Sequence, residues 1–254
     1  MFETTSEAEL HEALRECEVM QICRLFAPGS KILELGGGDG LQAKVLSDAG
    51  FEVTSIDIPS RQSRGRARFP VMDYEGGRIP FPDATFDGVF SSNVLEHIPN
   101  LSFSLSELRR VLKAGGIGVH ILPTPIWRFW TTFIHYPWLI HRTFAKTRGP
   151  ATVAMPRPSE VKRSRWDVMR QALALGFAAH GEYPNALAEL HYFRRAVWLN
   201  TFDVNGFEVV SCSSTGIFYT GQLLATSLSV SDRRTLARLL GSACSVFVTR
   251  TAGE

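Results

Sequence analysis

The stretch KILELGGGDG, residues 31–40, is a short apolar run that opens directly into a glycine-rich loop. Residues 41–49 follow with helical spacing of apolar side chains, and Gly50 closes them. A strand that passes through glycines into a helix leaves backbone N–H groups free and lets a ligand approach the main chain closely. The stretch therefore predicts a strand, a ligand-binding loop and a helix.

The spacing of the glycines separates two kinds of nucleotide site. A dinucleotide fingerprint GxGxxG would need glycine at positions 36, 38 and 41, but position 41 is Leu41. The glycines lie instead at Gly36, Gly38 and Gly40. This argues against a nicotinamide oxidoreductase.

Two carboxylates flank this loop in the predicted fold. Glu34 lies within the first strand, where a buried carboxylate is costly unless loop N–H groups or a cationic ligand satisfy it. Asp57 ends the next strand, which lies beside the first in a doubly wound sheet, so its two oxygens suit a ribose diol. Both features are shared with nicotinamide enzymes.

Strands alternate with helices along most of the chain. After the opening unit, apolar runs predict further strands at 52–56, 69–72, 86–91, 117–122, 207–213 and 242–249, with helices at 7–26, 101–112 and 231–240. We therefore expect an α/β fold with a Rossmann-like, seven-stranded, doubly wound, mostly parallel sheet and an antiparallel last strand.

The region after the fifth strand breaks this alternation. A length of 254 residues and 44% hydrophobic content fit a single domain over 1–254, with an N-terminal helix in 1–28. Residues 124–200 are aromatic and basic, with no clean period before a helical pattern at 166–175, and predict an insertion or lid that forms the acceptor side. Prolines interrupt the most apolar stretch, 119–140, and argue against a membrane-spanning helix.

Charge and cysteine content say little about partners. The 27 Lys and Arg against 25 Asp and Glu give a net charge of +2, so no nucleic-acid partner is expected. The four scattered cysteines form neither a disulfide framework nor a zinc motif. Without a secretory signal, we expect a cytoplasmic protein, with peripheral contact at the inner membrane face kept open as an alternative.

Several motifs between residues 32 and 123 occur in a characteristic order. In this order the segment resembles the class I S-adenosylmethionine (SAM) dependent methyltransferases, of the group around the ubiquinone and menaquinone biosynthesis enzymes. The motifs are ILELGGGDG, IDI ending at Ile58, Met72-Asp73-Tyr74, FDGVFSSNVLEHIPN from 86 and LRRVLKAGGIGVHIL from 108.

The resemblance implies SAM as cofactor and assigns it a set of contacts. It implies that Asp57 binds the ribose, Ile58 packs on adenine, Asp73 accepts from the adenine amino group, and Ser92 and Asn93 lie beneath the sulfonium. The full cofactor-binding set is Glu34, Gly36, Gly38, Gly40, Asp57, Ile58, Asp73, Tyr74, Ser92 and Asn93.

Histidines supply the candidates for catalysis. A sulfonium already activates the methyl group, so a general base is needed only when the acceptor is a hydroxyl of high pKa. We predict His97, just after the fourth strand, and His180 as catalytic residues. Some similar methyltransferases bind a divalent metal through Glu-x-x-Glu-His, but Asn93 replaces the first Glu here, and no metal is predicted.

The acceptor is the least constrained part of the prediction. The aromatic stretch at 127–138 and the neighbouring Lys and Arg suit an amphiphilic, anionic acceptor, so we expect an oxygen of a cell-surface polysaccharide or of its lipid-linked precursor. The alternatives are a quinone or natural-product O- or C-methyltransferase and a SAM-binding protein without catalysis.

Overall fold

A single seven-stranded sheet organises the protein. The computed structural model describes residues 6–59, 67–144, 179–221 and 228–252. The strand order is β3-β2-β1-β4-β5-β7-β6, and β7 is antiparallel to both of its neighbours whereas the first five strands are parallel. This confirms the predicted fold class. The strands are β1 (Lys31–Leu35), β2 (Glu52–Asp57), β3 (Val71–Asp73), β4 (Phe86–Ser92), β5 (Leu112–Pro123), β6 (Phe207–Ser214) and β7 (Cys244–Thr251).

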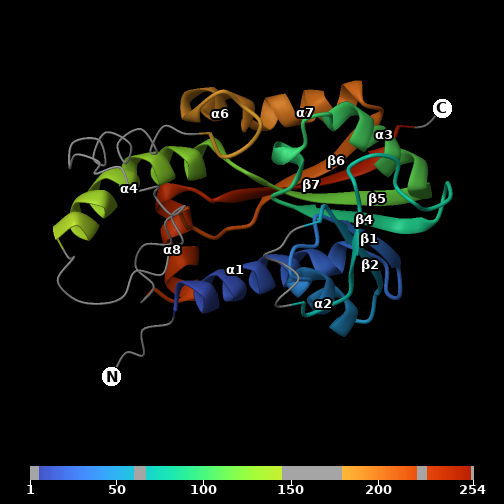
Figure 1. The fold of residues 1–254 in the computed structure, drawn as a ribbon, viewed down its shortest axis with the longest axis horizontal. Coiled ribbons are helices and arrows are strands. Elements are labelled where there is room, and N and C mark those ends of the chain that lie inside the picture. The colour runs from blue at the N-terminus through green and yellow to red at the C-terminus, as the bar shows by residue number, and fades with distance from the viewer. Residues whose placement is uncertain (1–5, 60–66, 145–178, 222–227, 253–254) are drawn as a thin grey trace, which may run out of the picture.

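Helices cover both faces of this sheet. In Figure 1, α1 and α2 lie on one face, and α3 and α7 lie on the other. The helices are α1 (Glu7–Ile22), α2 (Leu41–Asp48), α3 (Leu101–Val111), α4 (Pro125–Phe144), α6 (Ala186–Tyr192), α7 (Arg195–Val204) and α8 (Val230–Leu240), with short 3₁₀ turns η1 (Cys23–Leu25) and η2 (Leu95–His97). The arrangement is the predicted doubly wound one.

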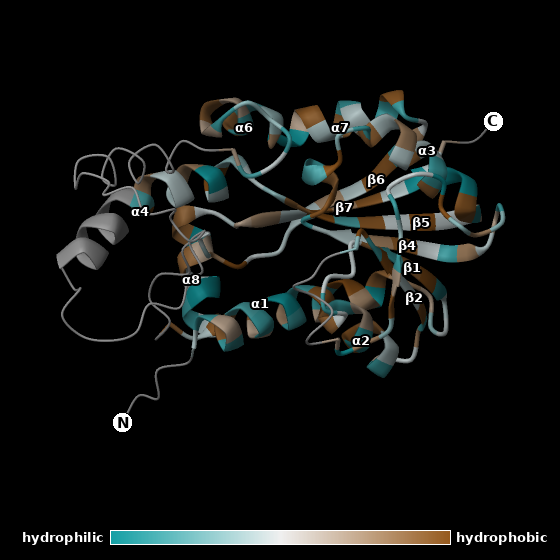
Figure 2. Cartoon of the chain, viewed as in Figure 1, coloured by the Kyte–Doolittle hydropathy of each residue, from teal (hydrophilic) through white to brown (hydrophobic). Residues whose placement is uncertain are grey.

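Alternation along the strands divides the core into two layers. Ile32 and Phe90 pack with α1, whereas their neighbours Leu33 and Val89 pack with α3 and α7. Successive strand side chains point to opposite faces, so strands buried on both sides are continuously apolar. Figure 2 shows this as hydrophobic colour concentrated on the central strands.

Helix α4 corrects the expectation that prolines break up residues 124–144. Pro125 occupies the first turn, where its missing N–H would have no intrahelical partner, and Thr124 Oγ1 accepts from the Trp127 N–H at 3.1 Å. Pro137 is accommodated within the helix. None of the described helices combines the length and the apolar character needed to cross a bilayer.

The described parts of the insertion pack on the rest of the protein. Trp130 Nε1 of α4 donates to the Leu240 carbonyl at 3.2 Å, and α7 packs beside β6. The sequence does not predict α6 or α7, because each is short and is stabilised by packing in the folded protein, α6 against α4 and α7 against β6. The predicted helix at 166–175 lies outside the described residues, and the division into domains remains a prediction.

We predict that Phe202→Ala destabilises the protein by about 3–5 kcal/mol, because this ring is fully buried between α7 and the sheet. It stacks on His120 of β5 at 5.2 Å and lies 5.8 Å from the ring of Phe247 in β7. Urea unfolding measures the loss. Val204→Ala, on the same helix at 69% exposure, is the control and should change the free energy by less than about 0.5 kcal/mol. Equal losses of free energy in the two variants would contradict the packing of α7 against the sheet.

Candidate functional site

The carboxyl ends of three adjacent strands meet at one edge of the sheet. Leu35 of β1 lies beside Ile56 of β2 and Ser91 of β4. The segments that follow these strands therefore gather at one place, the edge where open α/β sheets bind ligands.

The glycine loop begins with two hydrogen bonds to β2. The N–H groups of Gly36 and Gly37 both donate to the Ile56 carbonyl, at 2.8 and 3.2 Å. Gly36 has φ +83°, and a Cβ there would lie 2.2 Å from a methyl carbon of Val94. A side chain is excluded both by the backbone conformation and by the close approach of this neighbour.

Gly38 is placed differently from Gly36. Its φ is +56°, and a Cβ built there would meet no atom within 4 Å, so its backbone faces open space. Its N–H donates to Asp57 Oδ2 at 2.7 Å, while Oδ1 accepts from the Ile58 N–H at 2.7 Å. Asp57 thus lies against the loop, at the end of β2, as its predicted role requires.

Glu34 is a buried carboxyl group directly under the loop. Its side chain accepts a hydrogen bond from Ser55 Oγ at 2.5 Å, and its Oε1 has no hydrogen-bond partner among the described residues. Burial raises the pKa of Glu34 to about 7, although the Ser55 hydrogen bond opposes this and nearby Asp57 adds to it. A buried oxygen without a partner is a position at which a ligand donor would be stabilised.

The residues predicted to contact adenine have different environments. The side chain of Ile58 is 62% exposed, and Asp73 pairs in register with Asp57 across β2 and β3. The Tyr74 side chain, however, is buried in the core, where its hydroxyl donates to the Gly77 carbonyl. Any contact of Tyr74 with a cofactor would have to be made by its backbone.

Ser92 and Asn93 lie where β4 ends. Asn93 has φ +54°, a conformation that few residues other than glycine adopt, and its N–H donates to the Ile121 carbonyl of β5 at 2.9 Å. Its Nδ2 donates to Ser92 Oγ at 3.2 Å. Strained backbone of this kind is often found at functional sites.

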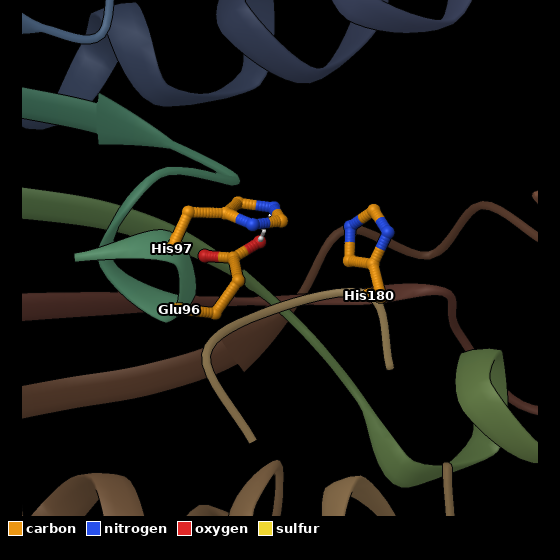
Figure 3. Close-up of side chains that lie close together, drawn as sticks. All are labelled: Glu96, His97 and His180. Atoms are coloured by element: carbon orange, nitrogen blue, oxygen red, sulfur yellow. Dashed lines mark ion pairs between the residues drawn. The ribbon is translucent and has the colours of Figure 1, made fainter. Parts of the chain in front are cut away.

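The two predicted catalytic histidines lie together. The ring centroids of His97 and His180 are 4.7 Å apart (Figure 3). The ring of Trp127 in α4 also contacts His180, at 4.7 Å between centroids. Burial lowers the pKa of His97, and burial together with His97 lowers the pKa of His180 to about 4. Both imidazoles are therefore neutral near pH 7.

Glu96 belongs to the same cluster as the two histidines. Its carboxyl group is fully buried, lies 3.9 Å from His97 Nε2, and has no hydrogen-bond partner on either oxygen among the described residues. Its ligand atom and those of His97 and His180 lie within 4.8 Å of one another, so these three side chains could hold a small cation. The prediction that the protein uses no metal stays a prediction.

The segment carrying His180 is fixed by its backbone. The N–H groups of His180 and Gly181 donate to Glu189 Oε1 at 2.5 and 2.7 Å, and the Glu182 N–H donates to the Glu96 carbonyl at 3.0 Å. The predicted site residues do not include Glu96 and Glu189, because no local pattern in the sequence indicates that these distant segments meet.

Comparisons with known proteins agree with this geometry. Residues 33–119 match the family model described as a methyltransferase domain. Demethylmenaquinone methyltransferase from Beutenbergia cavernae is 34% identical over 105 residues, which cover 39% of this chain and 44% of that protein. The chain thus spans less than half the length of this curated relative.

Two solved structures share the fold over most of the chain. A SAM-dependent methyltransferase from Methanosarcina mazei has a TM-score of 0.56 and 18% identity, over 92% of this chain and 98% of its own. A Burkholderia thailandensis 1,6-didemethyltoxoflavin-N1-methyltransferase, solved with S-adenosylhomocysteine (SAH), has a TM-score of 0.51 and 14% identity, over 95% and 79%.

The chain therefore has the fold of the SAM-dependent methyltransferases. Its residues 33–119, which contain the glycine loop, Asp57 and Glu96, match the methyltransferase-domain model, in agreement with the resemblance of the sequence motifs.

We predict that the free energy of unfolding of the wild type falls relative to that of Glu96→Gln as pH rises from 5 to 8, because burial raises the pKa of Glu96 from 4.5 to about 8. Taking the difference removes the contributions of Glu34 and of the histidines, which both proteins share. Between these values Glu96 keeps its proton in the folded protein and releases it in the unfolded chain, so the stabilisation that it gives below pH 4.5 is lost as pH rises through 8, at roughly 1.4 kcal/mol per pH unit.

Urea unfolding at pH 5, 6, 7 and 8, with a chelator present, measures this slope. The wild type should lose stability relative to Glu96→Gln along this series, but not relative to Glu182→Gln, a change at an exposed position. A difference between wild type and Glu96→Gln that does not change with pH would show that burial does not raise the pKa of Glu96.

Proposed function

We propose that this protein transfers a methyl group from SAM to a small-molecule acceptor. The observation that carries the proposal is the open backbone at Gly38, between the buried carboxyl group of Glu34 and the carboxylate of Asp57. The family match and the shared fold support SAM as the cofactor. SAM supplies a methyl group on a positively charged sulfur, which makes that sulfur a good leaving group.

The chain's own residues fit such a cofactor. Asp57 offers two oxygens to ribose hydroxyls in exchange for its present bonds to the Gly38 and Ile58 N–H groups. Glu34 Oε1 is an acceptor without a partner in the described structure, and Ile58 offers exposed apolar surface for adenine. Gly36 and Gly40 have no side chains, so the loop backbone can lie close to its neighbours.

His97 and His180 would assist the acceptor. A neutral imidazole can take the proton of a hydroxyl as the hydroxyl oxygen attacks the methyl group. Both rings are neutral near pH 7, and His97 is 39% exposed, so it can reach a bound molecule. We assign the general base to His97, and to His180 the role of holding that ring through their contact.

The acceptor we propose is amphiphilic, with a hydroxylated head and an apolar tail. Trp127 brings the start of α4 to His180, and along the same helix Ile126, Phe129 and Phe133 are 41–59% exposed. The relative from B. cavernae is named for a methyl transfer to demethylmenaquinone, an observation that favours a quinol head. A lipid-linked glycan shares the same chemistry and is the competing candidate. Peripheral contact with a membrane would follow from either.

We predict micromolar binding of SAM and SAH in calorimetry, and a loss of at least about tenfold in affinity in Asp57→Asn, because two hydrogen bonds to a charged acceptor are weakened. Asp48→Asn is the control, since Asp48 bonds only Lys44 on the surface of α2 among the described residues. Binding of NADH in place of SAM would overturn the cofactor assignment.

We predict that purified protein transfers labelled methyl from SAM to an isoprenoid quinol more readily than to a lipid-linked glycan or to a soluble sugar. His97→Ala should lower the rate by about 100-fold while SAH still binds, and His191→Ala, exposed on α6, should not. Preference for the glycan would shift the acceptor to the competing class. Cofactor binding without transfer to any acceptor would indicate a non-catalytic SAM-binding protein.

A further inference from the structure

A buried polar chain connects the N-terminal helix to the end of β4. It runs from Arg15 and Glu18 of α1 through Tyr219 and Cys244 to Asn93. Glu18 and Cys244 are fully buried and Tyr219 is 6% exposed. Four distant parts of the sequence supply these residues, and none of the first four belongs to the cofactor or catalytic residues described above.

The charged end of this chain fixes the proton of Tyr219. Arg15 donates to Glu18 Oε2 at 2.8 Å, and the Tyr219 hydroxyl donates to Glu18 Oε1 at 3.1 Å, because an ionised carboxylate can only accept. Arg15 Nη1 lies 3.3 Å from the Tyr219 oxygen and donates to it. The Tyr219 oxygen therefore already has its donor.

The Cys244 thiol is the donor in its contact with Asn93. Burial raises the pKa of Cys244 and also that of Tyr219, so both groups keep their protons near pH 7. Cys244 Sγ lies 3.0 Å from the Tyr219 hydroxyl and 3.5 Å from Asn93 Oδ1. The Tyr219 oxygen is a second acceptor for the thiol, but an amide oxygen can only accept, so the thiol is the donor to Asn93 Oδ1.

This contact decides which end of the Asn93 amide faces the site. The two ends of a carboxamide have nearly the same shape, so its hydrogen-bond partners determine its orientation. Here Oδ1 is held by Cys244, while Nδ2 lies on the other side and donates one of its two hydrogens to Ser92 Oγ at 3.2 Å. The second hydrogen has no partner among the described residues and is available to a ligand.

We infer that Cys244 is a positioning residue that holds the carboxamide of Asn93 so that it presents an N–H donor, and not a carbonyl oxygen, at the end of β4. This inference rests on the proposed function. A donor at this place suits a lone pair on the oxygen of an acceptor molecule and does not suit a sulfonium. Asn93 would thus orient the acceptor, and α1 would act on the site through Cys244.

The first experiment follows the side-chain amide resonances of Asn93 in nitrogen–proton NMR spectra of the ligand-free full chain. Cys244→Val keeps the volume but removes the donor, and should shift these resonances. Cys244→Ser restores a donor and should move them back toward the wild-type positions. Cys212→Ala, a half-buried cysteine of β6, is the control.

Cys244→Ala serves as a second variant without a donor should the valine disturb β7. Unchanged Asn93 resonances in the variants that lack a donor would overturn the inference.

The second experiment measures the ratio of the dissociation constants of SAM and SAH. In Cys244→Val the Asn93 amide loses its hydrogen-bond donor and can turn its oxygen toward the site. The affinity for SAM relative to SAH should then rise about fivefold, as expected for the gain of one hydrogen bond. Asn93→Gly tolerates the positive φ and removes the amide, so Cys244→Val should leave the ratio unchanged in that background.

These outcomes separate the inference from the proposed function. A change in the ratio that persists in the Asn93→Gly background would show that Cys244 acts through general packing, and would overturn the inference. If the wild type binds neither ligand, the proposed function fails, while the amide resonances still decide the orientation of Asn93.

Discussion

The shared Ile56 carbonyl is the constraint on which the site depends. Because the N–H groups of Gly36 and Gly37 both donate to it, the chain stays against β2 as it leaves β1. That path leaves no room for a side chain at Gly36, brings the Gly38 N–H to Asp57, and covers the Ser55–Glu34 hydrogen bond. The loop, the carboxylate of Asp57 and the buried acid Glu34 are therefore positioned together.

Strands buried on both faces can be predicted from the sequence because each is a short, nearly continuous apolar run. This predicted β1, β4 and β5, although β5 begins five residues earlier than expected, at Leu112. The strands β3 and β7 each begin two residues later than expected. The prediction failed at α4 because Pro125 and Pro137 were interpreted as breaks, although the first turn of a helix accepts proline. Helices α6 and α7 gain their stability from packing that no local pattern shows.

The residues proposed to bind the cofactor lie within β1 or at and just after the carboxyl ends of β1, β2, β3 and β4, so short local motifs in the sequence point to each of them. The contacts around His97 and His180 could not, since Glu96, Trp127 and Glu189 come from separate elements that meet only in the folded chain. Tyr74 shows that a recognisable motif does not by itself place a side chain in the site, because its side chain packs in the core.

The two ends of β7 lie at opposite edges of the sheet, and only its first residue lies at the carboxyl edge of the parallel strands. Its first residue, Cys244, pairs with Pro123 at the carboxyl edge, while Thr251 pairs with Phe207 at the opposite edge, roughly 24 Å away for a strand of this length. A fluorophore, affinity tag or surface linker joined after Thr251 would therefore leave the cofactor edge unobstructed. The protein can be immobilised through this end with its binding face toward solution.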